Sequence, residues 1–432
     1  MRFNEEGERM DFSFIHAADI HLDSPLKGLS RYEGAPVDKL RSATRDAFRN
    51  LVNLAIEERV NFIIIAGDLY DGDWKDYNTG LFFASEMARL NKHEIPVFMI
   101  NGNHDAASII TKEIKLPENV NIFNVKKCET KLLEDLNVAL HGQGFQTRAV
   151  VDNLAKAYPD KLAGYFNIGI LHTSAGGREG HENYAPCTLD DMKGKAYDYW
   201  ALGHIHKREI LSDERPVIIF PGNIQSRHSK ETGEKGCTLI RVESGEINHI
   251  QHVPLDVLRW DVIEVDASGI EAYEEFLSLV EELLERSYLN ADHRMLAVRF
   301  IVIGQTSIDM ELRKNREGVL NDIRSIAFSV GQGDIWIEKI KIKTSHKKIF
   351  TAIQDDGSPI STILNWVDDT ADLSELLDEI KVEFSTLSNS LPIELKRGEN
   401  QVIPSSEEML AEKLNEVKHM IQLQLELEEV NR

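Results

Sequence analysis

Five short polar clusters in the first half of the chain contain the residue types that bind divalent metals. Carboxylate, imidazole and amide oxygen together suit borderline metals such as manganese, iron and zinc. Within two clusters a pair of such residues is separated by one position, which lets both side chains of an extended segment point to the same side. The clusters are Asp19-Ile20-His21, Gly67-Asp68, Asn103-His104-Asp105, His172 and Gly203-His204-Ile205-His206.

These clusters offer more ligands than one ion can use. The candidates are Asp19, His21, Asp68, Asn103, His172, His204 and His206. A two-metal site with Asp68 as the bridging carboxylate accounts for all of them. Such a site holds its ions roughly 3.5–4 Å apart and clamps the attacking and leaving oxygens of a phosphate ester. Taken singly, a strand-end aspartate is usually a cap or turn former, and a lone histidine is usually a core residue. The prediction therefore depends on all five clusters occurring together in one chain.

Each cluster follows an apolar run that is typical of a buried strand. The runs are FSFIHA (12–17), NFIIIAG (61–67), PVFMIN (96–101), FNIGILH (166–172) and YDYWALG (197–203). In an open α/β sheet the carboxyl ends of the strands line the ligand crevice, so clusters at these ends would converge. Apolar residues at helical spacing predict intervening helices. Those helices cover 37–59 and about 79–92, with further strands at 120–125, 137–142 and 216–222 and a hairpin turning at Ser244-Gly245.

The rest of the chain has a different pattern. Residues 258–345 read as strand, helix, strand, helix and strand, which predicts a small α/β domain. Residues 351–432 contain helices, and the final one, about 405–430, has an apolar stripe and acidic residues in its first turn. We therefore predict three parts: a catalytic α/β domain over 1–257, a small α/β domain over 258–346 and a helical tail over 347–432.

The bulk composition is that of a soluble globular protein, with 42% hydrophobic and 28% charged residues. No run approaches the ~20 apolar residues of a membrane span, and the polar N-terminus does not read as a signal peptide. Three widely spaced cysteines favour a reducing cytoplasm. The net charge of −23 argues against a simple nucleic-acid coat, but residues 351–432, with 18 acidic and 6 basic side chains, hold much of the excess. Local basic patches on the body stay open.

The order D-x-H, G-D, G-N-H-D, H and G-H-x-H resembles the signature of the calcineurin-like metallophosphoesterases. FIHAADIHLDSP, GDLYDG and FPGNIQSRHSKETGEKG are similar, more specifically, to the bacterial YhaO group, relatives of the SbcD exonuclease subunit. The resemblance implies a four-layer α/β/β/α metallophosphoesterase sandwich with a small α/β capping domain and a helical C-terminal tail. It also implies two divalent metal ions, Mn²⁺ first, with iron and zinc as alternatives.

The same resemblance assigns roles to the site residues. One metal would be held by Asp19, His21 and His206, the other by Asn103, His172 and His204, with Asp68 between them. His104 would be a catalytic histidine that binds no metal and stabilises the transition state or protonates the leaving oxygen, and Asp105 would orient it by accepting its other ring N–H. In the loop after the 216–222 strand, Asn223, Arg227 and His228 would hold the scissile or a neighbouring phosphate, with a solvated loop as the equal alternative.

The function implied is hydrolysis of DNA phosphodiester bonds by an exonuclease or end-processing nuclease. Its partners would be DNA and an SbcC-like SMC/ABC-type ATPase bound through the C-terminal helices, with a homodimer formed through the helices at 37–59 and 79–92 and no membrane. Two alternatives stay open. One is a phosphodiesterase of small phosphoesters such as cyclic nucleotides, because the same dimetal site serves both. The other is a DNA-repair adaptor with weak nuclease activity.

Overall fold

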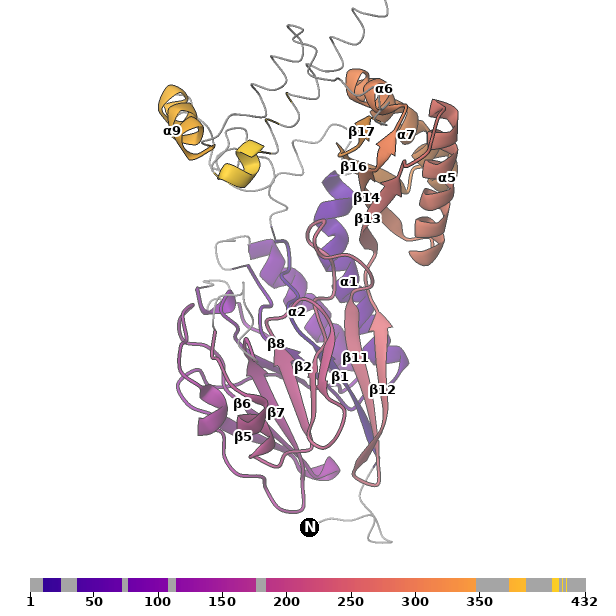
Figure 1. Ribbon diagram of the computed structural model, residues 1–432. Coiled ribbons are helices and arrows are strands. Elements are labelled where there is room, and N and C mark those ends of the chain that lie inside the picture. Colours follow the sequence, from indigo (N-terminus) through magenta and orange to yellow (C-terminus); the bar gives the residue numbers. More distant parts are fainter. Residues whose placement is uncertain are drawn as a thin grey trace, which may run out of the picture. The chain divides into compact units, whose positions relative to one another are not determined.

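The computed structural model describes residues 11–24, 37–71, 77–107, 114–175, 184–346 and 373–385, with 406–411, 414 and 417. These fall into two compact units. The larger unit comprises Met1–Thr306 and Asn315–Ser345, and the smaller comprises Ser307–Lys314 and His346–Arg432. The larger unit contains all the predicted site residues, and Figure 1 shows its sheets and helices.

The first sheet has six strands in the order β12-β11-β1-β2-β3-β4. Figure 1 labels the first four of them. Its parallel strands are β1 (Phe12–Ala17), β2 (Phe62–Ala66), β3 (Val97–Ile100) and β4 (Val120–Ile122). The hairpin of β11 (Gly236–Glu243) and β12 (Glu246–Pro254) adds to the other side of β1, with β11 antiparallel to it. The expected turn is confirmed: Ser244 and Gly245 have φ of 52° and 78°, as a tight two-residue hairpin requires.

The second sheet also has six strands, in the order β5-β6-β7-β8-β10-β9. Four parallel strands form its centre: β6 (Val138–Gly142), β7 (Phe166–His172), β8 (Tyr199–Gly203) and β10 (Val217–Phe220). The antiparallel edge strands, β5 (Glu129–Leu133) and β9 (Glu209–Ser212), were not predicted. Both are only partly buried, so they lack the continuous apolar run that revealed the central strands.

The two sheets stack face to face over a shared apolar core. Phe14 and Phe62 of the first sheet stack with ring centroids 5.0 Å apart, and Tyr199 of the second meets Phe14 edge-on at 5.4 Å. Helices α1 (Val37–Glu57) and α2 (Tyr77–Lys92) cover the outer face of the first sheet. The outer face of the second is covered by short elements, η4 (Leu154–Ala157) and α4 (Leu189–Lys193). Two mixed sheets lie between helical layers of unequal thickness.

Residues 258–345 fold as the small α/β arrangement that the sequence predicts. Strands β13 (Leu258–Asp266), β14 (Met295–Ile303) and β16 (Ile335–Ile342) form one parallel sheet, and α5 (Tyr273–Asn290) and α7 (Arg316–Gly331) connect them. Leu40 of α1 packs against Trp260 and Trp336 of this sheet. The first domain is therefore joined to the small sheet by an apolar contact as well as by the chain.

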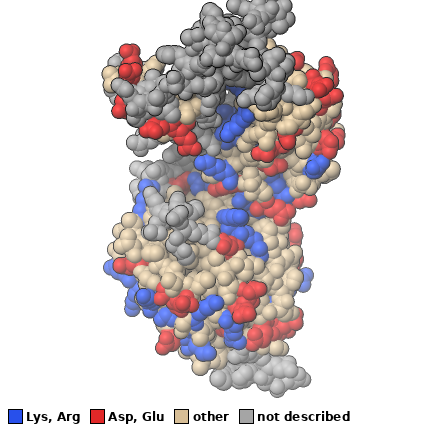
Figure 2. Space-filling view, viewed as in Figure 1, with Lys and Arg blue, Asp and Glu red and all other residues tan. Residues whose placement is uncertain are grey.

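The remaining elements are short. They are η2 (Asp105–Ala107), η3 (Glu134–Leu136), a two-stranded sheet of β15 (Gln305–Thr306) and β17 (Ser345–His346), α6 (Asp309–Lys314) and α9 (Leu373–Glu383). Most of the helix expected over 405–430 lies outside the described residues. None of the described helices is long and apolar enough to cross a membrane. On the face shown in Figure 2, Lys and Arg side chains are interspersed with Asp and Glu and do not form one continuous basic surface.

Candidate metal centre

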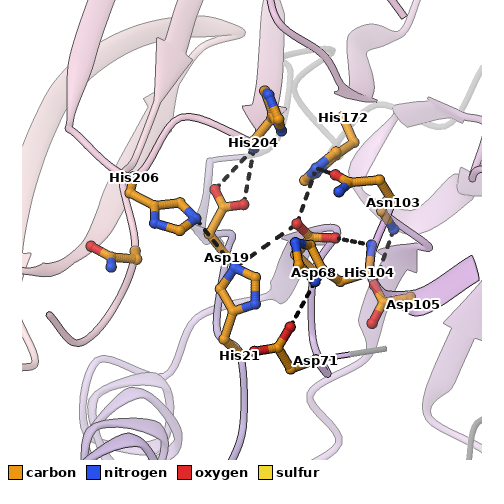
Figure 3. Close-up of polar contacts among 12 residues, drawn as sticks. Asp19, His21, Asp68, Asp71, Asn103, His104, Asp105, His172, His204 and His206 are labelled. Carbon is orange, nitrogen blue, oxygen red and sulfur yellow. Dashed lines mark hydrogen bonds and ion pairs between the residues drawn. The ribbon is translucent and has the colours of Figure 1, made fainter. Parts of the chain in front are cut away.

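All five predicted clusters meet at one end of the two stacked sheets (Figure 3). Each lies at or directly after the carboxyl end of a parallel strand: β1, β2 and β3 in the first sheet, β7 and β8 in the second. Backbone hydrogen bonds join neighbouring clusters. The Asp19 N–H donates to the Gly67 carbonyl over 3.1 Å, and the His21 N–H donates to the Asp68 carbonyl over 3.0 Å. The stacking of the sheets brings together residues up to 187 positions apart, Asp19 and His206.

Four of the predicted ligands have a left-handed backbone. Their φ values are 51° for Asp19, 46° for His21, 53° for Asp68 and 103° for His204. Residues other than glycine adopt such values rarely, and aspartate and histidine do so more readily than most. The chain turns sharply at each strand end, which directs these side chains inward instead of along the strand.

Asp68 lies between two histidines, as a bridging ligand must. Its Oδ2 is 3.3 Å from Nε2 of His172 and 3.9 Å from Nε2 of His21, while Oδ1 accepts the His104 backbone N–H over 2.9 Å. Its side chain is buried. Two triads made up of predicted ligands have ligand atoms within 4.8 Å of one another: Asp19, His21 and His206, and Asp19, Asp68 and His172.

In the first triad two imidazole nitrogens face each other. Nε2 of His21 faces Nε2 of His206 at 3.2 Å. The Nδ1 atom of His206 donates to the Glu231 carboxylate over 2.6 Å, which leaves its Nε2 as a lone pair. Two ring nitrogens directed at one point beside a buried carboxylate fit a divalent cation better than they fit each other.

His172 and Asn103 face each other in a similar way. Nδ1 of His172 donates to the Ala66 carbonyl over 2.9 Å, so in a neutral imidazole Nε2 would be a lone pair, and it faces Oδ1 of Asn103 at 2.9 Å. Two acceptors at that distance require a proton or a cation between them. Burial lowers the pKa of His172, but the neighbouring Asp68 and Asp19 carboxylates outweigh it and raise that pKa to about 9. A proton therefore occupies the position that a metal would take.

His204 reaches the centre in a different way. Its backbone N–H donates to both carboxylate oxygens of Asp19, each over 3.0 Å. Its ring centroid lies 5.3 Å from that of His172 and 5.2 Å from that of Tyr184. The imidazole thus lies beside His172 and belongs to neither triad, so its role as a metal ligand stays a prediction.

Burial sets the charge states of the carboxylates in the metal-free centre. It raises the pKa of Asp19 to about 6, although His206 and His172 oppose the shift. Burial also acts to raise the pKa of Asp68, but His172 and His21 outweigh it and hold that pKa well below the usual range. The central carboxylate is therefore charged, as a bridging ligand must be.

The predicted role of Asp105 is wrong. Its carboxylate accepts three backbone N–H groups, from Leu69 at 3.1 Å, Tyr70 at 2.8 Å and Gly102 at 3.0 Å. Asp105 begins the η2 turn, which directs its side chain back toward the end of β2. It fixes the loop that carries Asp68 instead of orienting a histidine.

Asp71 is the residue that pairs with His104. Its Oδ1 lies 2.7 Å from Nδ1 of His104, and this contact raises the pKa of the imidazole. The Asp71 carboxylate also accepts from the Ser24 hydroxyl over 2.6 Å and from the Arg227 guanidinium over 2.9 Å. The available signal was GDLYD itself, in which a second aspartate follows Asp68 by three residues.

Comparison with known proteins shows to which family the chain belongs. The model of the calcineurin-like phosphoesterases matches residues 12–208, and the model of the middle domain of metallophosphoesterase YhaO matches residues 260–345. The metallophosphoesterase YhaO of Bacillus subtilis (strain 168) is 38% identical over 297 residues, which cover 68% of this chain and 72% of that protein. The chain is a calcineurin-like metallophosphoesterase of the YhaO type.

The DNA double-strand break repair protein Mre11 is a more distant relative. The Sulfolobus acidocaldarius protein is 26% identical over 291 residues, covering 63% of this metallophosphoesterase and 70% of the relative. The Sulfurisphaera tokodaii protein is 27% identical over 280 residues, covering 62% and 68%. A dimetal phosphatase from Danio rerio is 12% identical with a TM-score of 0.33, covering 56% of this chain and 97% of that one.

In this metallophosphoesterase the three phosphate-contact candidates have different surroundings. Asn223 is wrong as a contact: it is 0% exposed, and its amide donates to the Gln225 carbonyl and to Glu231, each over 3.0 Å. The residue lies three positions after the end of β10, inside the loop that leads to β11. Arg227 is at the centre, bound to Asp71. The side chain of His228 is 58% exposed and its Nε2 is 3.6 Å from Glu231.

Glu231 is the second residue that sequence reasoning missed. It accepts from His206 and Asn223 and from the Arg227 backbone N–H. Burial acts to raise its pKa, but His206 and the Arg227 backbone N–H outweigh burial and lower that pKa to about 2. It lies in the quoted KETGEKG stretch, but a glutamate among lysines in a polar loop has no pattern that distinguishes it from a solvated one.

Proposed function

We propose that the chain is a dimetal phosphodiesterase that hydrolyses DNA phosphodiester bonds, as an exonuclease or end-processing nuclease in DNA repair. The observation that carries the phosphoesterase chemistry is the position of Asp68 between His21 and His172, with a second carboxylate, Asp19, beside it. The kinship with Mre11 supports DNA as the substrate.

The donor set fits two divalent ions. Asp19, His21 and His206 would hold one, Asn103, His172 and His204 the other, and Asp68 would bridge them. When bound, the ions lower the pKa of a water nucleophile and stabilise the charge of a pentavalent phosphorus. Imidazole, carboxylate and amide oxygen suit manganese, with iron and zinc as alternatives.

The protein's own contribution is centred on His104. Because Asp71 engages Nδ1, the proton available to a leaving oxygen is the one on Nε2. The contact with Asp71 raises the pKa of His104, so the imidazole keeps that proton nearer to neutral pH. His104 is only half-buried, beside the fully buried His21 at a ring-centroid distance of 5.0 Å, so it can approach a bound phosphate. It would protonate the leaving alkoxide.

We also propose that a second protein helps this chain to bind DNA. The chain carries a net charge of −23, and basic groups are interspersed with acidic ones in Figure 2, so a second protein would help to hold the duplex. An SbcC-like SMC/ABC-type ATPase bound through the C-terminal helices would supply that surface. A homodimer would use α1 and α2, and on α2 the exposed Tyr77 and Leu81, 54% and 59% accessible, are four residues apart.

Hydrolysis of a small phosphoester such as a cyclic nucleotide is the second candidate function. The centre acts on a phosphodiester whatever the ester groups are, and this chemistry favours neither substrate. An adaptor with weak nuclease activity is less consistent with a centre in which Asp68, His172 and Asn103 converge within hydrogen-bond distances.

One assay separates these functions. The purified chain is incubated with Mn²⁺ and labelled duplex ends, single strands, a cyclic nucleotide or an aryl phosphodiester, with and without the ATPase, beside a His104→Ala control. DNA cleavage that the His104→Ala control lacks is the expected result. Turnover of the small esters with no cleavage of DNA under any condition would reject the nuclease.

A further inference from the structure

The loop between β10 and β11, residues 221–235, is bound to the backbone of one predicted metal ligand. The Asn223 N–H donates to the His206 carbonyl over 3.2 Å, and the Lys235 ammonium donates to the same carbonyl over 3.4 Å. Gly222 has φ of 81°, and a Cβ there would lie 2.9 Å from the carbonyl of His206. The loop therefore passes in direct contact with the segment that presents His206.

Glu231 is the side chain that this loop directs at the centre. Its Oε1 accepts from Nδ1 of His206 over 2.6 Å, the shortest hydrogen bond that His206 makes among the described residues. A histidine that donates from Nδ1 keeps Nε2 as a lone pair, and it is Nε2 that faces His21. The carboxylate thus sets both the tautomer and the ring orientation that coordination requires.

The other oxygen of Glu231 has a separate task. Oε2 accepts the Arg227 backbone N–H over 2.7 Å and the Asn223 amide over 3.0 Å. The Arg227 guanidinium in turn donates to Asp71, which pairs with His104. One carboxylate, 9% exposed, therefore connects the predicted metal ligand on one side to the histidine–aspartate pair on the other.

We propose that Glu231 is a positioning residue of the dimetal centre: it fixes His206 for metal binding and, through Arg227, holds the Asp71–His104 pair in place. This inference rests on the dimetal centre of the proposed function. All three partners of Glu231 are donors, and both of its oxygens are used. The site accepts a carboxylate and no neutral isostere, because an amide has only one acceptor end.

The sharpest test is Glu231→Gln. Whichever way the new amide turns, its NH₂ faces a donor, either His206 on one side or Arg227 and Asn223 on the other. Facing the amide NH₂, His206 would have to accept at Nδ1 and carry its proton on Nε2, which removes its lone pair from the centre. We expect Mn²⁺ affinity at one of two sites to fall by about 10- to 100-fold, the usual cost of losing such a partner, while the other site is retained.

Binding is measured by calorimetric titration of the full chain with Mn²⁺, without a phosphoester. Glu234→Gln is the matched control, because it removes an exposed carboxylate from the same loop and Glu234 lies near Arg259, away from His206. The effect is then measured again in a His206→Ala background. If Glu231 acts through His206, Glu231→Gln costs affinity in the wild-type chain and little or nothing more in that background.

Two results would overturn the inference. One is a Glu231→Gln chain that binds two Mn²⁺ ions with wild-type affinity. The other is an equal loss of affinity in both backgrounds, which indicates a general structural role. If the Gln variant does not fold, Glu231→Asp is measured in the same way, since it keeps the charge but is one methylene too short to bond both sides. The titration uses no DNA, so its outcome is independent of whether DNA is the substrate.

Discussion

Replacing Asp71 with asparagine tests the most specific contact that the structure adds. Asp71→Asn keeps the shape of the side chain and removes its charge. In the wild-type chain the carboxylate contacts Nδ1 of His104 at 2.7 Å, the Arg227 guanidinium at 2.9 Å and the Ser24 hydroxyl at 2.6 Å. Arg227 has only donors, so the amide oxygen must face Arg227, and the NH₂ then faces Nδ1 of His104, which can accept from it only as a neutral imidazole.

The size of the effect follows from the loss of one charge-assisted contact to His104. Such a contact contributes roughly 1.5–3 kcal/mol. At about 1.4 kcal/mol for each tenfold change in rate, kcat/KM falls about 10- to 100-fold. The contact also raises the pKa of His104, so its loss lowers the pH above which the imidazole gives up its proton. The alkaline limb of the pH–rate profile therefore moves to lower pH.

The assay is the pH dependence of kcat/KM on an aryl phosphodiester with saturating Mn²⁺. Asp135→Asn, which removes an exposed carboxylate from η3, is the control for a change in net charge. Metal content is measured in parallel, because His21, Asp71 and His104 could themselves hold a cation. An unchanged profile would refute the pairing. Loss of one bound ion would show that Asp71 is a ligand and does not act only on His104.

Three further outcomes are expected. Asp68→Asn removes the bridging carboxylate, so calorimetry should show weaker binding of both Mn²⁺ ions. In the metal-free chain the pKa of His172 is about 9, above its ordinary 6.5, so the stability that its charge provides is complete below about pH 6.5 and is lost as pH rises through about 9. Thermal unfolding with a chelator should show this decline, and His172→Gln should flatten it. Gly203→Ala places a Cβ against the Ala66 carbonyl and Nδ1 of His172, so it should weaken metal binding with little change in secondary structure by circular dichroism.

Each of these outcomes can fail in a recognisable way. Full retention of one ion by the Asp68→Asn chain would show that Asp68 serves a single metal. A stability that rises between pH 6.5 and 9 without metal would contradict the protonated His172. Wild-type Mn²⁺ affinity after Gly203→Ala would show that the backbone at β8 can shift without moving the imidazole.

The strand ends were predictable because burial on both faces leaves a plain signal. FIIIA of β2 and VFMI of β3 are fully buried, so they appear in the sequence as unbroken apolar runs followed by polar residues. The edge strands β5 and β9 carry exposed residues and gave no such signal. The same asymmetry holds at the site, where the ligand candidates directly after a buried strand were recognised, whereas Asp71 and Glu231, farther along their loops, were not.

The sequence by itself determined which side chains lie at the strand ends and that their chemistry suits two metals, because the order of apolar runs and polar clusters is local information. Only the tertiary structure decided which carboxylate serves which histidine. Asp105 is next to His104 in the chain, but its turn directs it at three backbone N–H groups, and Asp71 takes its place. Glu231 reaches His206 from a loop 25 residues later. Side-chain direction in a turn depends on backbone angles and on neighbours from other strands, and neither is present in a local pattern.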